Sequence, residues 1–191
     1  MPFPFEETAV RTVFTAISHA SFLKPIVVFV GSVLPWVIAL WFVVTVFRIK
    51  SFKLKFYYFA LATIAIIISR GIITEMLYSL FYSPRPFEFF GISPVISHAL
   101  KSGMPSGHMA WLVPIAFSFL SMRRRTGIVA ASLVALVGIA RIIGGVHWPS
   151  DIVIGIVVGI VGFVVARAIL PAKLSVEHLK KAEIDEEKNS V

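Results

Sequence analysis

Five long apolar segments dominate this sequence and limit what the chain can fold into. They cover residues 26–47, 56–81, 108–122, 128–146 and 152–170. A helix needs about 20 apolar residues to cross the hydrocarbon core of a bilayer, and four of the segments approach or exceed that length. The third is short, so we expect it to borrow length from its flanks. The pattern predicts an all-α integral membrane helical bundle with about five transmembrane helices.

The composition agrees with a membrane protein. Of the 191 residues, 58% are hydrophobic, and the mean hydropathy is +0.90, which soluble domains of this size rarely reach. The chain has no cysteine, which excludes disulfides, thiolate catalysis and cysteine metal sites. The net charge is +8, but the basic residues form short clusters between apolar runs, so we expect no nucleic-acid partner. The oligomeric state is not indicated.

The two ends of the chain differ from its middle. Residues 8–22 alternate apolar and small polar side chains, which predicts an amphipathic N-terminal helix in the interface plane or against the bundle. The acidic start and the length of the first apolar run argue against a cleavable signal peptide. We therefore divide the chain into an amphipathic segment 1–25, a transmembrane domain 26–170 and a charged tail 171–191.

Basic residues at alternate junctions predict the orientation of the chain. Those between the first and second segments, between the third and fourth, and after the fifth are Arg48, Lys50, Lys53, Lys55, Arg123, Arg124, Arg125 and Lys173. Cytoplasmic loops of membrane proteins carry such an excess of Lys and Arg. We expect a multi-pass plasma-membrane protein with an external N-terminus and a cytoplasmic C-terminus. Residues 82–107 and 147–151 then share the external face.

Two arginines on that face are suited to binding phosphate. Arg85 lies between two prolines after the second segment, and Arg141 lies near the end of the fourth. A guanidinium group is a planar fork that binds phosphate oxygens in a bidentate way. Arg141 lies inside an apolar segment, where a charge is costly unless it faces a polar site. Both residues therefore point to an anion site.

The Pro-Ser-Gly-His stretch at residues 105–108 can begin a helix that binds an anion. Pro105 suits the first turn, because its missing N–H costs nothing there. Gly107 lets the backbone approach a ligand closely. The free N–H groups of Ser106, Gly107 and His108 then form an anion site at the helix N-terminus.

A histidine and an aspartate complete the predicted site. Asp151 follows His147 by four residues and can bind one ring nitrogen, which fixes the tautomer and leaves the other nitrogen as a nucleophile. The alternative is a metal site of two histidines and a carboxylate, formed with His108. Arg85 and Arg141 would repel a divalent cation and attract an anion. We therefore expect a phosphate site with no metal and no cofactor.

These residues resemble the three signature motifs of the type 2 phosphatidic acid phosphatase (PAP2) superfamily in order and spacing. The motifs here are Arg85-Pro86, Pro105-Ser106-Gly107-His108, and Arg141 followed by His147 and Asp151. The resemblance covers residues from about 50 to 170 and makes the transmembrane domain the catalytic domain. It implies a helical bundle, a lipid phosphate or diphosphate substrate in the bilayer, and a phosphohistidine intermediate formed without metal.

The resemblance also implies a role for each motif residue. His147 would be the nucleophile, His108 the acid that protonates the leaving oxygen, and Asp151 the residue that orients His147. The residues that would bind the phosphoryl oxygens are Arg85, Arg141, Ser106 and Gly107.

Two positions depart from the family pattern. The first motif usually has a lysine seven residues before its arginine, and the third a serine before its arginine; here these positions are Tyr78 and Ala140. Lys101 is a candidate to replace the missing charge, with Tyr78 and Glu75 as further auxiliary candidates. Arg70 precedes Tyr78 by eight residues, about 12 Å along a helix, so we expect it to lie out of reach and to pair with Glu75. The alternative is that Glu75 contacts the site from below.

A narrower resemblance concerns the substrate. The Tyr-Ser-Pro-Arg-Pro-Phe stretch at residues 82–87, the short chain and the N-terminal amphipathic segment are similar to the small bacterial undecaprenyl-diphosphate phosphatases of this superfamily. They imply hydrolysis of undecaprenyl diphosphate to undecaprenyl phosphate and phosphate. The alternatives are a phosphatidic acid or phosphatidylglycerophosphate phosphatase and, in a different class, an anion- or proton-coupled transporter.

Overall fold

The computed structural model describes residues 3–97 and 102–170 of the chain. Within these ranges helices are the only regular secondary structure, which confirms the predicted all-α class. Lys101 and the predicted tail 171–191 lie outside the described residues. The helical elements are α1 (Pro4–His19), η1 (Ser21–Leu23), α2 (Lys24–Val28), η2 (Phe29–Val33), α3 (Leu34–Phe47), α4 (Phe52–Ile66), η3 (Ile67–Thr74), α5 (Glu75–Leu80), α6 (Pro86–Phe89), α7 (Gly107–Met122), α8 (Arg124–Ile143) and α9 (Pro149–Ile169).

Four helices in the described ranges are long and apolar enough to cross a membrane. Two of them are composite: η1 to α3 form one helix of 27 residues, and α4 to α5 form one of 29 residues. Each contains a π-helical segment, η2 or η3, with a widened turn. The other two are α8 and α9. The membrane bundle predicted from the apolar segments is therefore confirmed, with four full-length spans and one shorter helix.

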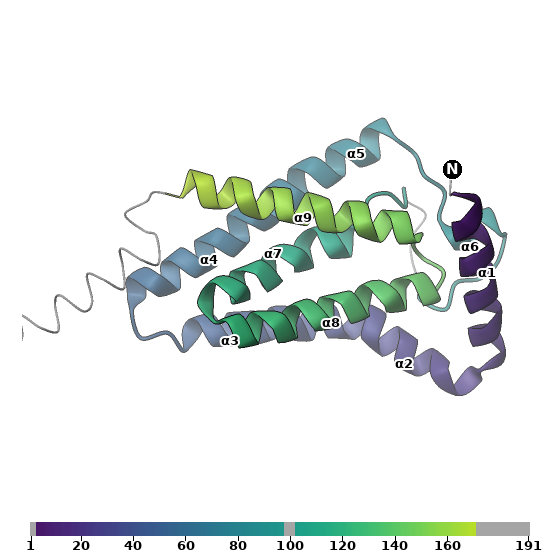
Figure 1. Ribbon diagram of the computed structural model, residues 1–191, viewed down its shortest axis with the longest axis horizontal. Helices are drawn as coiled ribbons and strands as arrows, with labels where there is room; N and C mark the ends of the chain where they lie inside the picture. The colour runs from purple at the N-terminus through teal and green to yellow at the C-terminus, as the bar shows by residue number, and fades with distance from the viewer. Residues whose placement is uncertain (1–2, 98–101, 171–191) are drawn as a thin grey trace, which may run out of the picture.

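The shorter helix is α7, and the expectation that it borrows length from its flanks is wrong. It has 16 residues, and the backbone is extended at Ser106 before it and at Arg123 after it. At 1.5 Å per residue α7 is about 24 Å long. It needs no further length because the other spans surround it, as Figure 1 shows for α4, α8 and α9.

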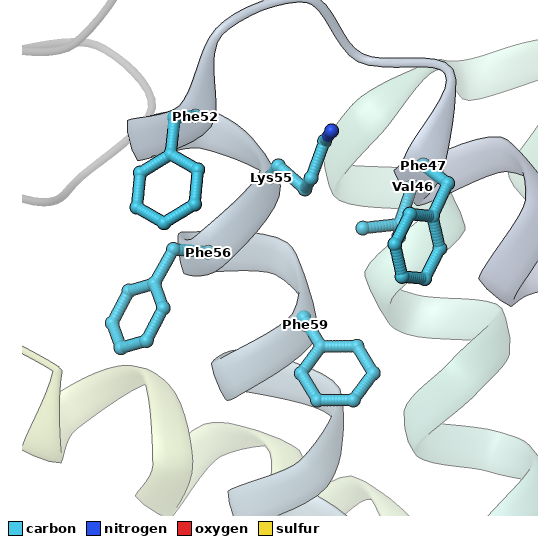
Figure 2. A pocket seen from close by; sticks show the side chains of 6 residues that line it. All are labelled: Val46, Phe47, Phe52, Lys55, Phe56 and Phe59. Carbon is cyan, nitrogen blue, oxygen red and sulfur yellow. The ribbon is translucent and has the colours of Figure 1, made fainter.

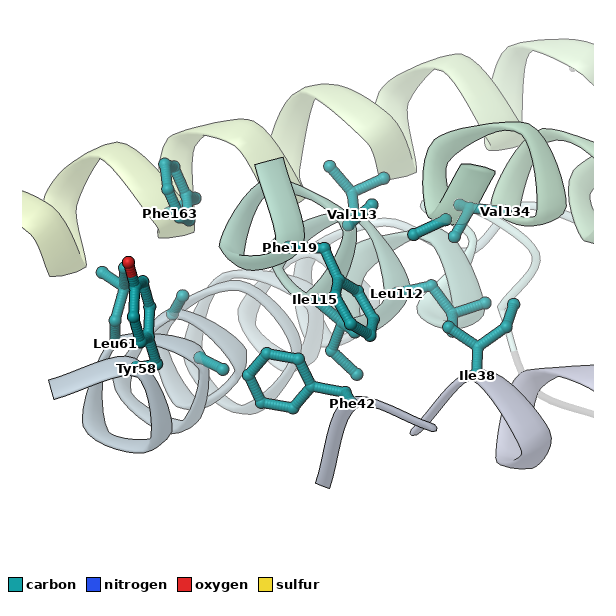
Figure 3. Close-up of a cluster of buried hydrophobic side chains, with 14 of the residues drawn as sticks. Ile38, Phe42, Tyr58, Leu61, Leu112, Val113, Ile115, Phe119, Val134 and Phe163 are labelled. Carbon is teal, nitrogen blue, oxygen red and sulfur yellow. The ribbon is translucent and has the colours of Figure 1, made fainter. Parts of the chain in front are cut away.

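The hydrophobic core is built around α7 (Figure 3). Met109, Leu112 and Phe119 of this helix are fully buried against side chains from α3, α4, α8 and α9. On the outer helices many large apolar side chains point outward instead, including Trp36 and Leu40. An apolar exterior around a packed core is the arrangement expected of a protein whose surroundings are lipid.

A proline inside α7 connects this helix to η3. Pro114 has no N–H, so the carbonyl oxygen of Ala110 lacks its helical partner. The hydroxyl of Ser69 in η3 donates to this oxygen at 2.7 Å. Thr74 of the same segment donates to the Ser69 carbonyl at 2.8 Å. Because an unpaired backbone group is costly in lipid, the contact of Ser69 with Ala110 fixes η3 against the first half of α7.

The two ends of the bundle differ in character. The basic clusters at residues 48–55 and 123–125 lie at the α3–α4 and α7–α8 turns, at one end. At the other end lie α6, the start of α7, the α8–α9 turn and α1 (Figure 1). Helix α1 is attached there by buried Glu6, whose carboxylate accepts hydrogen bonds from the amide (2.7 Å) and hydroxyl (3.1 Å) of Ser150. The second end contains the candidate site.

Candidate active site

Arg85 is buried at the centre of the second end. Pro84 and Pro86 flank it, and its extended backbone forms the N-cap of α6. Its Nη1 donates to the carbonyl of Val146 at 2.8 Å, and its Nη2 to the carbonyl of Ser102 at 3.0 Å. Only 2% of its surface is exposed, and this burial lowers the pKa of its guanidinium group. Two backbone carbonyls thus hold one fork rigidly in place.

His147 lies between Arg85 and Asp151. Its Nδ1 is 3.3 Å from Oδ2 of Asp151, and its Nε2 is 3.2 Å from Nη1 of Arg85. A guanidinium group has no acceptor, so Nε2 must accept this hydrogen bond, and the ring proton is then on Nδ1. The predicted contact between His147 and Asp151 is therefore present. With its proton on Nδ1, His147 points the lone pair of Nε2 toward Arg85.

The position of Asp151 follows from the start of α9. Trp148 is the N-cap of this helix, and its amide donates to Oδ2 of Asp151 at 2.9 Å. An acidic residue in the first turn is favoured by the helix dipole. The indole nitrogen of Trp148 donates to the carbonyl of Pro84 at 2.9 Å, which ties the start of α9 to the segment that carries Arg85.

Arg141 supplies a second buried fork from the last turn of α8. It is 1% exposed, and its Nη1 donates to the carbonyl of Gly31 in η2 at 3.0 Å. Its Nε and Nη2, together with the buried hydroxyl of Ser106, have no hydrogen-bond partner among the described residues. Arg141 also lies within the electrostatic range of Arg85. Leaving a buried donor unpaired costs about 1–3 kcal/mol, so this arrangement fits a bound anion.

The start of α7 differs from the prediction in two details. Ser106 is the N-cap and α7 begins at Gly107, so Pro105 precedes the helix and is not in its first turn. The amide of Ser106 donates to the carbonyl of Asp151 at 2.9 Å and is not free for an anion. The cause is the close approach of α9, because a Cβ added at Gly155 would lie 2.7 Å from the Ser106 carbonyl oxygen.

The next two residues lie in the first turn of α7, as Gly107 is its first residue and His108 its second. The first turn of a helix is where an anion can bind, so the anion site at these two residues stays a prediction. The ring of His108 is half-buried, 6.1 Å from that of Trp111 between centroids. Both residues lie at the same end of the bundle as the two arginines.

Two residues of the site were missed by the sequence reasoning. Ser102 presents its carbonyl to Arg85, and its hydroxyl donates to the carbonyl of Phe81 at 3.0 Å. A Cβ added at Gly103 would lie 3.2 Å from Cγ of Arg85 and 3.2 Å from Oδ2 of Asp151. The glycine therefore allows the loop to pass between the arginine and the carboxylate. The sequence signal that could have revealed this contact is Gly103 itself, a second glycine close to the Pro-Ser-Gly-His stretch.

Arg70 is also part of this region, and the expectation that it lies out of reach is wrong. A Cβ added at Gly107 would lie 3.0 Å from Nε of Arg70 and 3.3 Å from the hydroxyl of Tyr78. The predicted ion pair with Glu75 is present. Eight residues are close to two helical turns, so Arg70 and Tyr78 share a face, and the long arginine side chain covers the distance between them. Tyr78, at the position where the family usually has a lysine, thus has an arginine beside it.

The geometry gives no support to the metal alternative. Within residues 3–97 and 102–170, no three His, Asp or Glu side chains are grouped closely enough to hold a metal ion. His108, His147 and Asp151 therefore do not form the two-histidine, one-carboxylate set. Metal-independent chemistry stays a prediction.

A well-formed cavity lies far from these residues. It has a volume of about 220 Å³ and is lined by Val46, Phe47, Phe52, Lys55, Phe56 and Phe59. Figure 2 shows three of the phenylalanine rings along α4, with Phe47 and Val46 on the other side. This cavity is at the end with the basic turns and is almost entirely apolar. Apart from Lys55 the lining residues are apolar, so this cavity is not the candidate site.

Comparison with known proteins gives the class. Residues 59–174 match the PAP2 superfamily, and this match includes all three motifs. The chain therefore belongs to the PAP2 superfamily, and the resemblance predicted from its motifs is confirmed. The fold and the family together make it a multi-pass membrane protein.

Individual relatives are similar over different shares of their length. The chain is 30% identical over 142 residues to the bacitracin transport permease protein BcrC of Bacillus licheniformis, covering 73% of this chain and 68% of the relative. It is 32% identical to undecaprenyl-diphosphatase BcrC of Bacillus subtilis, covering 51% of each. It is 33% identical to the putative undecaprenyl-diphosphatase YbjG of Escherichia coli, covering 49% of this chain and 48% of the relative. The chain thus spans about half the length of the latter two.

Proposed function

We propose that this protein is a membrane phosphatase that removes the terminal phosphate from a lipid phosphate or diphosphate. The preferred substrate is undecaprenyl diphosphate, which yields undecaprenyl phosphate and phosphate. One observation carries the proposal: Nε2 of His147 contacts buried Arg85, and buried Arg141, within electrostatic range of Arg85, has donors without a hydrogen-bond partner among the described residues. A nucleophile near buried donors that can bind phosphate is what phosphoryl transfer requires.

The first step forms a phosphohistidine. Nε2 of His147 attacks the terminal phosphorus in line, and the bond from phosphorus to the leaving oxygen breaks. His108 gives a proton to that oxygen as it takes the electron pair. Asp151 accepts the Nδ1 proton in a hydrogen bond and stabilises the positive charge that forms on the ring. When substrate binds, the N–H of Arg85 Nη1 that faced Nε2 donates to a phosphoryl oxygen, while Nη1 and Nη2 stay bonded to the carbonyls of Val146 and Ser102.

The second step releases phosphate. A water attacks phosphorus, His108 now takes the proton of that water, and the N–P bond breaks with its electron pair returning to Nε2. In both steps the equatorial oxygens are bound by the forks of Arg85 and Arg141, the hydroxyl of Ser106 and the amide of Gly107. These donors are fixed by the protein before the charge develops, so little reorganisation is needed.

The relatives support a diphosphate substrate. Two proteins of similar sequence are named undecaprenyl-diphosphatases. A third is named a transport permease, but the arrangement of charges here favours catalysis. Buried Arg85, Arg141 and Asp151 belong to the start of α6, the end of α8 and the start of α9, and these helix ends lie at one end of the bundle (Figure 1). Transporter sites lie near the middle of the membrane instead.

We also propose that the site faces the outside of the cell and that the C-terminus is cytoplasmic. The basic turns at residues 48–55 and 123–125 lie at the opposite end from the site, as the positive-inside rule requires. The chain has no cysteine, so single cysteines can be introduced at positions 101 and 124 and labelled in intact cells. A membrane-impermeant reagent is expected to label Lys101→Cys alone, and labelling of Arg124→Cys would reverse the orientation.

The direct test is phosphate release by the detergent-purified protein. We would compare undecaprenyl diphosphate, phosphatidic acid and phosphatidylglycerophosphate, each with and without EDTA. We expect the highest kcat/KM with the diphosphate and no effect of EDTA. Release from none of the three would contradict the proposed function. Loss with EDTA that a divalent ion restores would contradict the metal-independent mechanism.

A further inference from the structure

Arg70 differs from the other two arginines in where it lies and what holds it. Arg85 and Arg141 are almost fully buried and bind backbone carbonyls. The Arg70 side chain is 35% exposed, and its Nη1 forms an ion pair with Glu75. Its guanidinium carbon lies over the ring of Tyr78, 5.8 Å from the ring centroid. Arg70 is thus an oriented cation at the rim of the site.

The tyrosine beneath it is fixed as well. The hydroxyl of Tyr78 donates to the carbonyl of Pro105 at 2.8 Å, directly before the anion-binding start of α7. Ser69, the residue next to Arg70, is bonded to α7 through Ala110. Arg70 therefore lies in a helix that is attached to α7 at Ala110 and to the segment before α7 at Pro105. Its Nη1 points to Glu75, while its Nε lies beside Gly107.

The path of the substrate leads from the buried arginines to this rim. The attacked phosphorus must lie within reach of His147, and the leaving oxygen must face His108. Whatever is attached to the leaving oxygen then extends past His108 and its neighbour Gly107. Nε of Arg70 is 3.0 Å from the position that a Gly107 Cβ would take. In a diphosphate, the group that extends there is the second phosphate.

We infer that Arg70 binds the lipid-linked phosphate of a diphosphate substrate and makes the enzyme prefer diphosphates over monophosphates. The inference rests on the proposed function and adds a specificity-determining residue to it. A monophosphate ester has only carbon beyond the leaving oxygen, so Arg70 gains nothing from it. With a diphosphate, the charge of Arg70 lies beside the phosphate that leaves and stabilises it. Glu75 and Tyr78 position the guanidinium group.

The test compares two substrates that share one lipid, farnesyl diphosphate and farnesyl monophosphate. We expect Arg70→Ala to lower kcat/KM for the diphosphate about 10- to 100-fold, as loss of a charged hydrogen bond would. The monophosphate value is expected to change less than about threefold, which also shows that the variant is folded. Arg70→Lys keeps the charge and should retain more diphosphate activity than Arg70→Ala. Arg48→Ala, an exposed arginine at the opposite end, is the matched control.

A second measurement keeps the test decisive if the wild type cleaves the monophosphate too slowly. Inorganic diphosphate and orthophosphate are compared as competitive inhibitors. Arg70→Ala should weaken inhibition by diphosphate about tenfold or more and leave inhibition by orthophosphate unchanged. Equal losses for both anions or both substrates would contradict the inference, as would no loss at all. A wild type that releases phosphate from neither substrate would instead contradict the proposed function.

Discussion

The inner wall and the rim of the proposed phosphate site are both built with arginine, but in different ways. On the inner wall, Arg85 and Arg141 are buried and fixed by the carbonyls of Val146, Ser102 and Gly31. At the rim, Arg70 is partly exposed and fixed by side chains. Burial strengthens the electrostatic field of an arginine, whereas exposure to water weakens it. The inner wall therefore suits the phosphoryl group that is transferred in every reaction, and the rim suits the part that varies between substrates.

The largest effect should come from His147, the proposed nucleophile, which lies between Arg85 and Asp151. His147→Ala is expected to reduce phosphate release at least about 10⁴-fold on every substrate, because no N–P bond can form. The measurement is kcat with saturating diphosphate. Wild-type-like activity in a folded variant would remove His147 from the mechanism and leave the inner wall without a function.

The inner wall should respond alike to all substrates. Arg141→Lys keeps a charge but loses the fork, so we expect kcat/KM to fall about 10²- to 10³-fold for diphosphate and monophosphate together. This uniform loss is the counterpart of the selective loss expected at Arg70. A decrease in kcat/KM for only one of the two substrates would contradict the distinction between the inner wall and the rim.

A smaller effect should follow from disturbing the packing of the wall. In Gly103→Ala the added Cβ would lie 3.2 Å from both Arg85 and Asp151, so one of them must shift by a few tenths of an ångström. We expect about a tenfold loss of kcat/KM, since misplacement by about 1 Å costs about 10²-fold. Gly71→Ala is the matched control, because a Cβ there has no neighbour within 4 Å. Equal effects of the two substitutions would contradict the tight packing at Gly103.

The smallest effect should come from the attachment of α1. Glu6→Gln removes a charge that accepts hydrogen bonds from Ser150 at the start of α9. Such contacts at a helix N-terminus contribute about 1 kcal/mol, so we expect a Tm a few degrees lower and little change in kcat. Thermal unfolding in detergent measures this, with Glu7→Gln as the matched control. A large loss of kcat with an unchanged Tm would mean that Glu6 belongs to the site.

Much of the site was predictable because its residues are close in sequence or at the ends of spans. Asp151 follows His147 by one helical turn, and the alternation of spans places both near Arg85. The position of Arg70 beside Tyr78 and Gly107 was not predictable from counting residues along a helix. The rise per residue separates Cα atoms, whereas the contact is made by the end of a long side chain that lies in a π-helical segment.

Other features depend on packing between distant segments. The amide of Ser106 is occupied because α9 packs against α7 without a side chain at Gly155. The loop carbonyl of Ser102 meets Arg85 only in the folded bundle. The short α7 needs no extra length because protein surrounds it. These features arise from packing between segments that are far apart in the sequence, and the local sequence around each residue does not show which segment packs against it.

The central claim is that phosphate passes through a covalent bond to His147. The enzyme is mixed with a lipid diphosphate that is radiolabelled in its terminal phosphate and quenched within one turnover in base, where a phosphohistidine is stable. The account predicts label on the protein that maps to His147, is released by acid and is absent from His147→Ala. Phosphate release without protein-bound label, or label that persists in His147→Ala, would contradict it.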